Sequence, residues 1–144
     1  MKKPDERIIK FIHKHHVLTL ATSCKGIPYC SNCFYTYSED DNVFIFSSDR
    51  DTKHIQDLQC GNYVAASVVL ETNTVGKIQG LQINGTLSEP TGELAKKAKK
   101  HYLKRFPFAR LMETTLWTLR PDYIKMTDNR LGFGKKLIWE NQEK

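Results

Sequence analysis

The sequence predicts a mainly β domain of the α+β class, in which an antiparallel barrel or strongly curled sheet carries peripheral helices. Two observations predict it. Short runs of β-branched and aromatic residues recur along the chain with turn-forming residues between them. Most links between neighbouring runs are also too short for the helical crossover that joins parallel strands. Because no internal repeat or Pro/Gly/Ser-rich linker divides the sequence, we expect a single domain over residues 1–144.

The first predicted element is an amphipathic helix. Pro4 suits a first helical position, and the helix is expected to end near His15. Its core side would carry four apolar residues, Ile8, Ile9, Phe11 and Ile12. Three strands are expected next, over 17–23, 28–37 and 43–48, and then a helix over 51–60 with Gly61 as its C′ residue. Strands over 63–71 and 77–88 follow, and after them a helix that is capped by Thr91 and stopped by Phe106 and Pro107. The last two strands are expected over 116–127 and 131–139.

The positive charge is concentrated in one segment. The sequence has 22 Lys and Arg against 16 Asp and Glu, a formal net charge of +6, and six of the basic residues lie between Lys96 and Arg105. At helical spacing an apolar stripe separates from the lysines, so we interpret the lysines as the solvent side of a helix. The alternative is a face that binds a polyanion such as nucleic acid.

Two features of the sequence bear on its cellular setting. No apolar run approaches the roughly 18 residues that a membrane span needs. The N-terminal residues up to Arg7 also lack the apolar stretch and small-residue cleavage site of a secretory signal. We therefore expect a cytoplasmic protein without membrane contact.

A hydroxyl-rich strand end followed at once by a helix start is the most informative local pattern. The third predicted strand ends in Ser47 and Ser48, and Thr52 and Lys53 fall in the first turn of the next helix. A first helical turn presents free backbone N–H groups and a partial positive charge. Hydroxyl, ammonium and N–H donors together suit a phosphate monoester, so this junction is a candidate anion site.

The alternative interpretation of the same junction needs no ligand. Asp49 and Asp51 would cap the helix and balance its charge, which would leave Lys53 as an ordinary surface residue.

The cysteines do not indicate a metal or redox motif. Cys30 and Cys33 lie three apart in a predicted strand, so their side chains should point to opposite faces of the sheet and could not chelate one ion. Without an export signal, we expect all four cysteines to be reduced and mostly buried. His13 and His16 share a helical face, but no nearby carboxylate or cysteine completes a metal site, and none is predicted.

The order of these segments resembles the pyridoxamine 5′-phosphate oxidase-like, FMN-binding split β-barrel proteins. The resemblance extends from about Val17 to Trp139 and includes a small bacterial branch of that superfamily. It rests on the segments 18–22, 43–48, the Thr52–Lys53 helix start, 63–68, 78–88, 105–110 and 127–136. The resemblance implies an antiparallel split β-barrel with peripheral helices.

The resemblance also implies a cofactor and a partner. Proteins of this family are homodimers that hold two FMN molecules in clefts between the subunits. Carried over by position, Ser31, Asn32, Cys33, Ser47 and Ser48 would lie along the isoalloxazine ring and ribityl chain, and Thr52 and Lys53 would hold the 5′-phosphate. Gln82 or Gln79 would approach the ring, and Trp117 or Trp139 would reach it from the partner subunit.

Two departures from the family pattern limit the functional expectation. Pyridoxamine phosphate oxidases place arginines where this chain has Ser31 and Thr52, with Arg50 as the nearby residue that could substitute. Without those guanidinium groups, the vitamin B6 oxidase reaction itself is not expected. The expected function is a small FMN-dependent oxidoreductase of unknown substrate, with no catalytic residue identified. The alternatives are a non-enzymatic barrel that binds another anionic cofactor, such as haem or another flavin, and a nucleic-acid-binding barrel.

Overall fold

The computed structural model describes residues 2–142, which form one antiparallel sheet and three α-helices. The helices are α1 (Glu6–Lys14), α2 (Lys53–Gln56) and α3 (Gly92–Arg105), and short 3-10 turns are η1 (Asp57–Cys60), η2 (Val75–Lys77), η3 (Pro107–Leu111) and η4 (Asn129–Leu131). The strands are β1 (Val17–Cys24), β2 (Ile27–Ser38), β3 (Val43–Ser47), β4 (Tyr63–Val69), β5 (Gln79–Ser88), β6 (Leu116–Asp128) and β7 (Lys136–Glu140).

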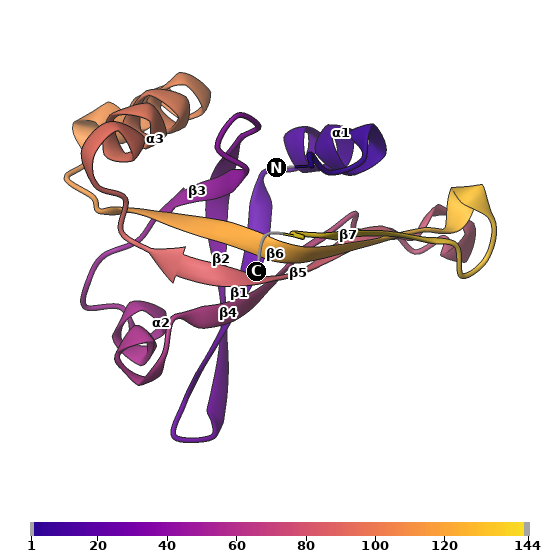
Figure 1. Cartoon of the computed structure of the whole chain (residues 1–144), viewed down its shortest axis with the longest axis horizontal. Helices are drawn as coiled ribbons and strands as arrows, with labels where there is room; N and C mark the ends of the chain where they lie inside the picture. The colour runs from indigo at the N-terminus through magenta and orange to yellow at the C-terminus, as the bar shows by residue number, and fades with distance from the viewer. Residues whose placement is uncertain (1, 143–144) are drawn as a thin grey trace.

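The sheet closes into a barrel through its third strand. The strand order is β3-β2-β1-β4-β5-β6-β7, and β3 pairs with β6 as well as with β2. All of these pairings are antiparallel. The expected antiparallel split barrel with peripheral helices is therefore confirmed. In Figure 1, α3 and α1 lie at the top of the view on either side of the β2–β3 turn, and α2 lies at the lower left, beside the β1–β2 hairpin.

β6 is long enough to pair with two different strands along one of its edges. Its first residues pair with β3, and its last residues pair with β7. A register shift between Asn84 and Gly85 of β5 leaves Asp122 as an extra residue in β6, next to Pro121. A Cβ atom on Gly85 would overlap the backbone of Arg120, so this close approach requires glycine. The register shift lies between the part of β6 that pairs with β3 and the part that pairs with β7.

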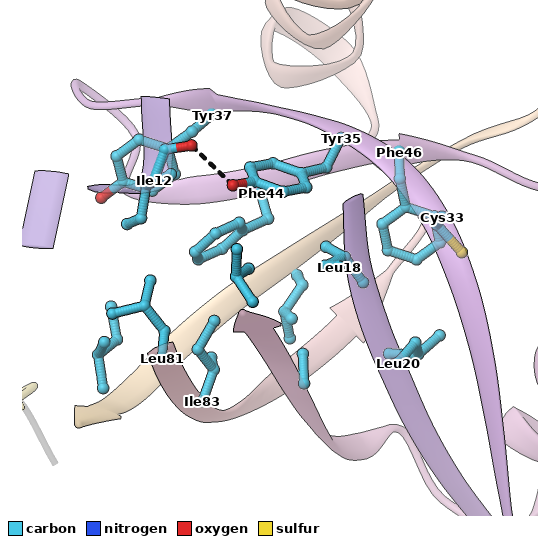
Figure 2. Packing of buried hydrophobic residues seen from close by; sticks show 14 of the residues in the cluster. Ile12, Leu18, Leu20, Cys33, Tyr35, Tyr37, Phe44, Phe46, Leu81 and Ile83 are labelled. Atoms are coloured by element: carbon cyan, nitrogen blue, oxygen red, sulfur yellow. Dashed lines mark hydrogen bonds between the residues drawn. The ribbon is translucent and has the colours of Figure 1, made fainter. Parts of the chain in front are cut away.

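The barrel interior holds the main hydrophobic core. α1 closes one end of it with the fully covered side chains of Ile8 and Ile12. Figure 2 shows the centre of this core, where the Tyr35 hydroxyl donates a hydrogen bond of 2.7 Å to the backbone carbonyl of Ile12. Burial raises the pKa of this phenol far above its usual value, so it remains a neutral donor. The bond attaches the last turn of α1 to β2.

Tyr35→Phe should lower the free energy of unfolding by about 1–2 kcal/mol, because it leaves the buried Ile12 carbonyl without this donor while preserving the ring. Urea denaturation followed by circular dichroism measures the change. Tyr29→Phe is the matched control, since the Tyr29 side chain is exposed. An equal loss in both variants would contradict the structural role given to the Tyr35 hydroxyl.

α3 makes a second, smaller core on the outside of the barrel. Its apolar stripe packs Ala98, Tyr102 and Phe106 against Val43 and Ile45 of β3. The lysines of this helix are exposed, as the periodicity predicts. They are partly neutralised by neighbouring acids; for example, Nζ of Lys97 lies 3.2 Å from an Asp41 carboxylate oxygen.

None of the helices within residues 2–142 has the length and apolar character to cross a bilayer.

Three element predictions were wrong in detail. The first helix begins at Glu6 with Asp5 as its N-cap, so Pro4 precedes the helix instead of opening it. The last strand covers only Lys136–Glu140, because Gly132 and Gly134 adopt positive φ values of 119° and 77° that interrupt an extended chain. The expected helix over 51–60 is divided into the four-residue α2 and the 3-10 turn η1.

Candidate functional site

The junction between β3 and α2 contains a compact polar cluster. Nε2 of His54 lies 2.5 Å from the Ser48 hydroxyl and 3.3 Å from the Thr52 hydroxyl. The two hydroxyl oxygens are themselves 3.3 Å apart, and the Thr52 hydroxyl donates to the Asp49 carbonyl at 2.8 Å. The structure therefore brings two predicted ligand-binding residues, Ser48 and Thr52, onto one histidine.

The His54 imidazole is held neutral near pH 7. Burial lowers its pKa below the usual value of 6.5, and the carboxylate of Asp57 opposes that effect only partly. A neutral ring has one nitrogen that donates and one that accepts, so His54 can orient the Ser48 hydroxyl without adding a positive charge to the site.

The stability of the protein should fall as the pH is lowered through the ordinary histidine range. The unfolded chain takes up a proton on His54 at its usual pKa near 6.5, whereas the folded chain resists protonation at this site, so acidification favours unfolding. Unfolding free energies of wild type and His54→Gln at pH 7.5 and 5.5 test this.

Wild type should lose more stability than His54→Gln on acidification. His16, whose pKa is also lowered by burial, is present in both proteins and cancels. Parallel losses in the two proteins would show that His54 does not titrate as inferred.

Lys53 stands at the edge of this cluster and is paired with an acid. Its Nζ lies 3.0 Å from one carboxylate oxygen of Asp57 and 5.0 Å from the ring centre of Tyr29. The other Asp57 oxygen accepts a hydrogen bond of 2.8 Å from the Thr22 hydroxyl. These contacts lower the pKa of Asp57, with the Lys53 bond the largest cause. About half of the Lys53 side chain is exposed, which leaves ammonium donors free for a ligand.

The three β2 residues that were predicted to lie along the cofactor, Ser31, Asn32 and Cys33, do not all point to the same face of the sheet. Register places Ser31 opposite Leu20 and Cys33 opposite Leu18, so both side chains share the inner face with those core residues. Burial raises the pKa of the Cys33 thiol to about 11, so it is not a reactive thiolate near neutral pH. The Ser31 hydroxyl is shielded from solvent and has no hydrogen-bond partner within residues 2–142.

Asn32 and Gln82 lie on the opposite, outer face of the sheet. Asn32 is paired with Thr19, whose hydroxyl donates to the Asn32 side-chain oxygen at 2.8 Å. Thr19 is in turn opposite Ser67, and Ser67 is opposite Gln82. The side chains of Asn32 and Gln82 therefore belong to one row that crosses four strands, separate from the cluster around Lys53.

The remaining predicted residues are engaged within the chain. Ser47 hydrogen-bonds through its hydroxyl to Thr114. Trp117 donates its indole N–H to the Ser48 carbonyl at 2.9 Å, and Trp139 donates to the Lys2 carbonyl at 2.8 Å. Gln79 is buried at the first residue of β5. Both tryptophans are buried in the core of the chain, and the indole N–H of each is already bonded within it.

The prediction that all four cysteines are reduced was wrong. Cys24, the last residue of β1, forms a disulfide with Cys60, the last residue of η1, and their Cα atoms are 5.2 Å apart. The pairing was missed because residues 36 apart in sequence meet only when η1 packs against the end of β1. Cys30 is exposed and Cys33 is buried, which confirms that they point to opposite faces.

The helix-start argument for the anion site is weaker than the sequence suggests. α2 has only four residues, too few for a substantial helix dipole, and the Thr52 side chain makes no capping bond. Arg50, the expected substitute for the missing arginines, forms a two-bond ion pair with Glu89 at 2.6 and 2.8 Å. The site therefore depends on its side-chain donors.

Three residues of the site were not identified from the sequence. Tyr29 contacts Lys53 through the packing of α2 on β2, whereas His54 contacts Ser48 across the β3–α2 junction and Asp57 lies one helical turn after Lys53. The one available signal was the i, i+4 spacing of Lys53 and Asp57, which places them on one side of a helix.

Sequence relatives cover nearly the whole chain. The chain is 36% identical over 133 residues to a UPF0306 protein of Photorhabdus laumondii, covering 92% of this chain and 93% of the relative. It is 39% identical over 130 residues to a UPF0306 protein of Klebsiella pneumoniae, covering 90% of this chain and 88% of the relative.

Solved structures share the fold at low sequence identity. A heme binding protein from Mycobacterium smegmatis matches with a TM-score of 0.76 and 16% identity; the match covers 97% of this chain and 60% of that larger chain. HutZ, the heme storage protein from Vibrio cholerae, matches with a TM-score of 0.67 and 18% identity over 83% of this chain and 91% of its own. A FAD-binding protein from Mesorhizobium loti matches with a TM-score of 0.67 and 15% identity over 87% of this chain and 95% of its own.

The family model for pyridoxamine 5′-phosphate oxidase matches residues 4–128, which include the whole barrel up to the end of β6. This match, the two UPF0306 relatives and the closed antiparallel sheet all indicate the same family. The chain belongs to the pyridoxamine 5′-phosphate oxidase family, in the UPF0306 branch.

Proposed function

We propose that the protein binds FMN in a cleft between two copies of the chain and acts as a small flavin-dependent oxidoreductase. The observation that carries the proposal is the shielded Ser31 hydroxyl, which lies on the inner face of β2 beside the Cys33 thiol and makes no hydrogen bond of regular geometry within residues 2–142. A shielded polar atom of this kind usually has a partner. Ser31 lies two residues from Tyr29, whose ring contacts Lys53, so a ligand that satisfied it would also reach the Lys53 ammonium.

The chemistry of the donor set fits a phosphate-bearing cofactor. Lys53 would supply charge to the phosphate. The hydroxyls of Ser48 and Thr52 would turn from His54 and the Asp49 carbonyl, their present partners, to donate neutral hydrogen bonds to it. Asp57 holds part of the Lys53 charge, and neither family arginine is present, so we expect FMN to bind more weakly than two guanidinium contacts would allow. FMN, when bound, would supply electron transfer through its isoalloxazine ring.

The outer face of the sheet supports the second copy. Exposed apolar side chains of Val17 and Phe34 lie opposite each other in the β1–β2 register, and Val69 of β4 is also exposed. A face of this kind is typical of a protein–protein interface. Asn32 and Gln82 lie on the same face, so in the proposed dimer these two side chains would approach the flavin of the partner.

The missing arginines also bear on the reaction. Because Ser31 and Thr52 replace guanidinium groups expected of a vitamin B6 oxidase, we do not propose pyridoxamine 5′-phosphate as the substrate. No described side chain in the cluster is positioned as an evident acid or base for a particular substrate, and the substrate remains open.

Haem is the second candidate ligand. It is favoured by two fold neighbours whose names state that they bind or store haem. The half-buried, neutral His54 offers an imidazole nitrogen of the kind that ligates haem iron. Its Nε2 is already bonded to Ser48, however, which favours a positioning role in the flavin site over iron ligation.

Titration of the purified protein with FMN tests the proposal. Quenching of flavin fluorescence should give saturable binding with one FMN per chain, and light scattering should give the mass of a dimer. A parallel titration with haem, followed at the Soret band, separates the two cofactors. Failure of FMN to bind at high micromolar concentration, together with a saturable Soret shift, would replace the flavin proposal with the haem alternative.

A further inference from the structure

The Cys24–Cys60 disulfide joins the proposed anion site to the barrel. Cys60 ends η1, the turn that directly follows α2, and Cys24 ends β1. The same two elements are also joined by the Thr22–Asp57 hydrogen bond of 2.8 Å. Asp57 in turn holds Lys53 at 3.0 Å. One covalent link and one polar link thus attach the eight-residue α2–η1 segment to β1.

The other attachments of the α2–η1 segment are non-covalent: His54 bonds to Ser48, Lys53 contacts the Tyr29 ring, and the Gln56 side chain donates to the Arg50 carbonyl at 3.2 Å. Ile55 is buried and Leu58 packs partly on the core, while the flanking Gln56 and Gln59 are exposed. A four-residue helix and a 3-10 turn have little stability of their own. Their order therefore depends on contacts with the rest of the chain, including the covalent link to β1.

We propose that the Cys24–Cys60 pair is a reversible redox site that controls the order of the α2–η1 segment. In the oxidised protein the segment is fixed, and Lys53, Thr52 and His54 are held in their positions around Ser48. In the reduced protein the Thr22–Asp57 bond, the two apolar contacts, the His54–Ser48 bond and the Lys53–Tyr29 contact remain, but the covalent link is lost, so the segment opens more often. The consequence for flavin, a lower affinity in the reduced protein, rests on the proposed function.

The exchange reaction balances with a small dithiol as reductant. Cys60 is exposed and Cys24 is half-buried, so a dithiol thiolate attacks the Cys60 sulfur. The Cys24–Cys60 bond breaks, and Cys24 leaves as a thiolate that takes up a proton from water. The second thiolate of the dithiol then attacks the mixed disulfide, which releases Cys60 and leaves the reductant as a cyclic disulfide. The pair gains two electrons and two protons.

Thiol counting and hydrogen exchange on the whole protein test the proposal. After denaturation, air-oxidised protein should show two titratable thiols, from Cys30 and Cys33, and dithiothreitol-treated protein should show four. Amide exchange over residues 53–61 should speed up about fivefold or more on reduction, the lower end of typical coupling between sites. Cys60→Ser should exchange at the fast rate with or without dithiothreitol.

The controls separate this proposal from the flavin proposal. Cys30→Ser should retain the full response to dithiothreitol, because Cys30 is not part of the pair. Four thiols in the air-oxidised protein, or equal exchange over residues 53–61 in both redox states, would overturn the redox site. FMN affinity is measured separately in the two states. If FMN binds in neither state, the flavin proposal fails while the exchange data still decide on the redox site.

Discussion

Lys53→Ala should weaken FMN binding about ten- to a hundredfold, the loss expected when one charge-assisted hydrogen bond of about 1.5–3 kcal/mol is removed. Lys53 supplies the positive charge in the cluster of Ser48, Thr52 and His54, since Arg50 is occupied by Glu89. The fold should tolerate the change because the Lys53 side chain is half exposed. Fluorescence titration with FMN measures the loss, with circular dichroism as a check on folding.

Asp57, the ion-pair partner of Lys53, provides a control in which the affinity for FMN should rise instead of fall. Asp57→Asn keeps the size of the side chain and a group that can accept from the Thr22 hydroxyl, but it removes the negative charge that competes with the phosphate for Lys53. FMN should then bind roughly threefold more tightly or better, the effect of deleting one like charge a few ångströms away in largely aqueous surroundings. A Lys53→Ala variant that binds FMN as well as wild type would remove Lys53 from the phosphate site.

The barrel could be predicted because its determinants are local. Strand runs, their turn residues and the short links between them follow directly from the sequence, and the Lys25–Gly26 turn has the positive φ values that this pattern requires. The family resemblance implied a split barrel, but the pairing of β3 with β6 that closes it was not predicted. The register shift at Gly85 likewise depends on a backbone contact with Arg120 on another strand, which has no local sequence signal.

The candidate site was predicted only in part, because its contacts are tertiary. Ser48 and Thr52 were expected beside a phosphate, and they do lie together. Their shared partner His54 and the acid Asp57 were not anticipated, since His54 reaches Ser48 through the turn between β3 and α2, and Asp57 is held by Thr22 where η1 packs on β1. Successive side chains of a strand point to opposite faces, which already separates Asn32 from Ser31 and Cys33. The residue roles carried over from the family by position nevertheless placed all three along one ligand.

Removal of the Cys24–Cys60 bond should lower the free energy of unfolding by about 4 kcal/mol, on the loop-entropy model for a closed loop of 36 residues. The loop contains β2, β3 and α2. Breaking the bond therefore removes the cross-link constraint from about a quarter of the residues in the unfolded chain. Urea denaturation of air-oxidised wild type and Cys60→Ser measures the difference.

The same experiment identifies the origin of the effect. Wild type in excess dithiothreitol should unfold with the free energy of Cys60→Ser, because both lack the cross-link. Cys30→Ser should stay within about 0.5 kcal/mol of wild type, since its thiol is exposed and unpaired. If dithiothreitol leaves the stability of wild type unchanged while Cys60→Ser is destabilised, the cost arises from the substitution itself, and the bond does not stabilise the fold. Stability and exchange over residues 53–61 should therefore change together, since a single covalent link limits both global unfolding and local opening of the segment that carries Lys53.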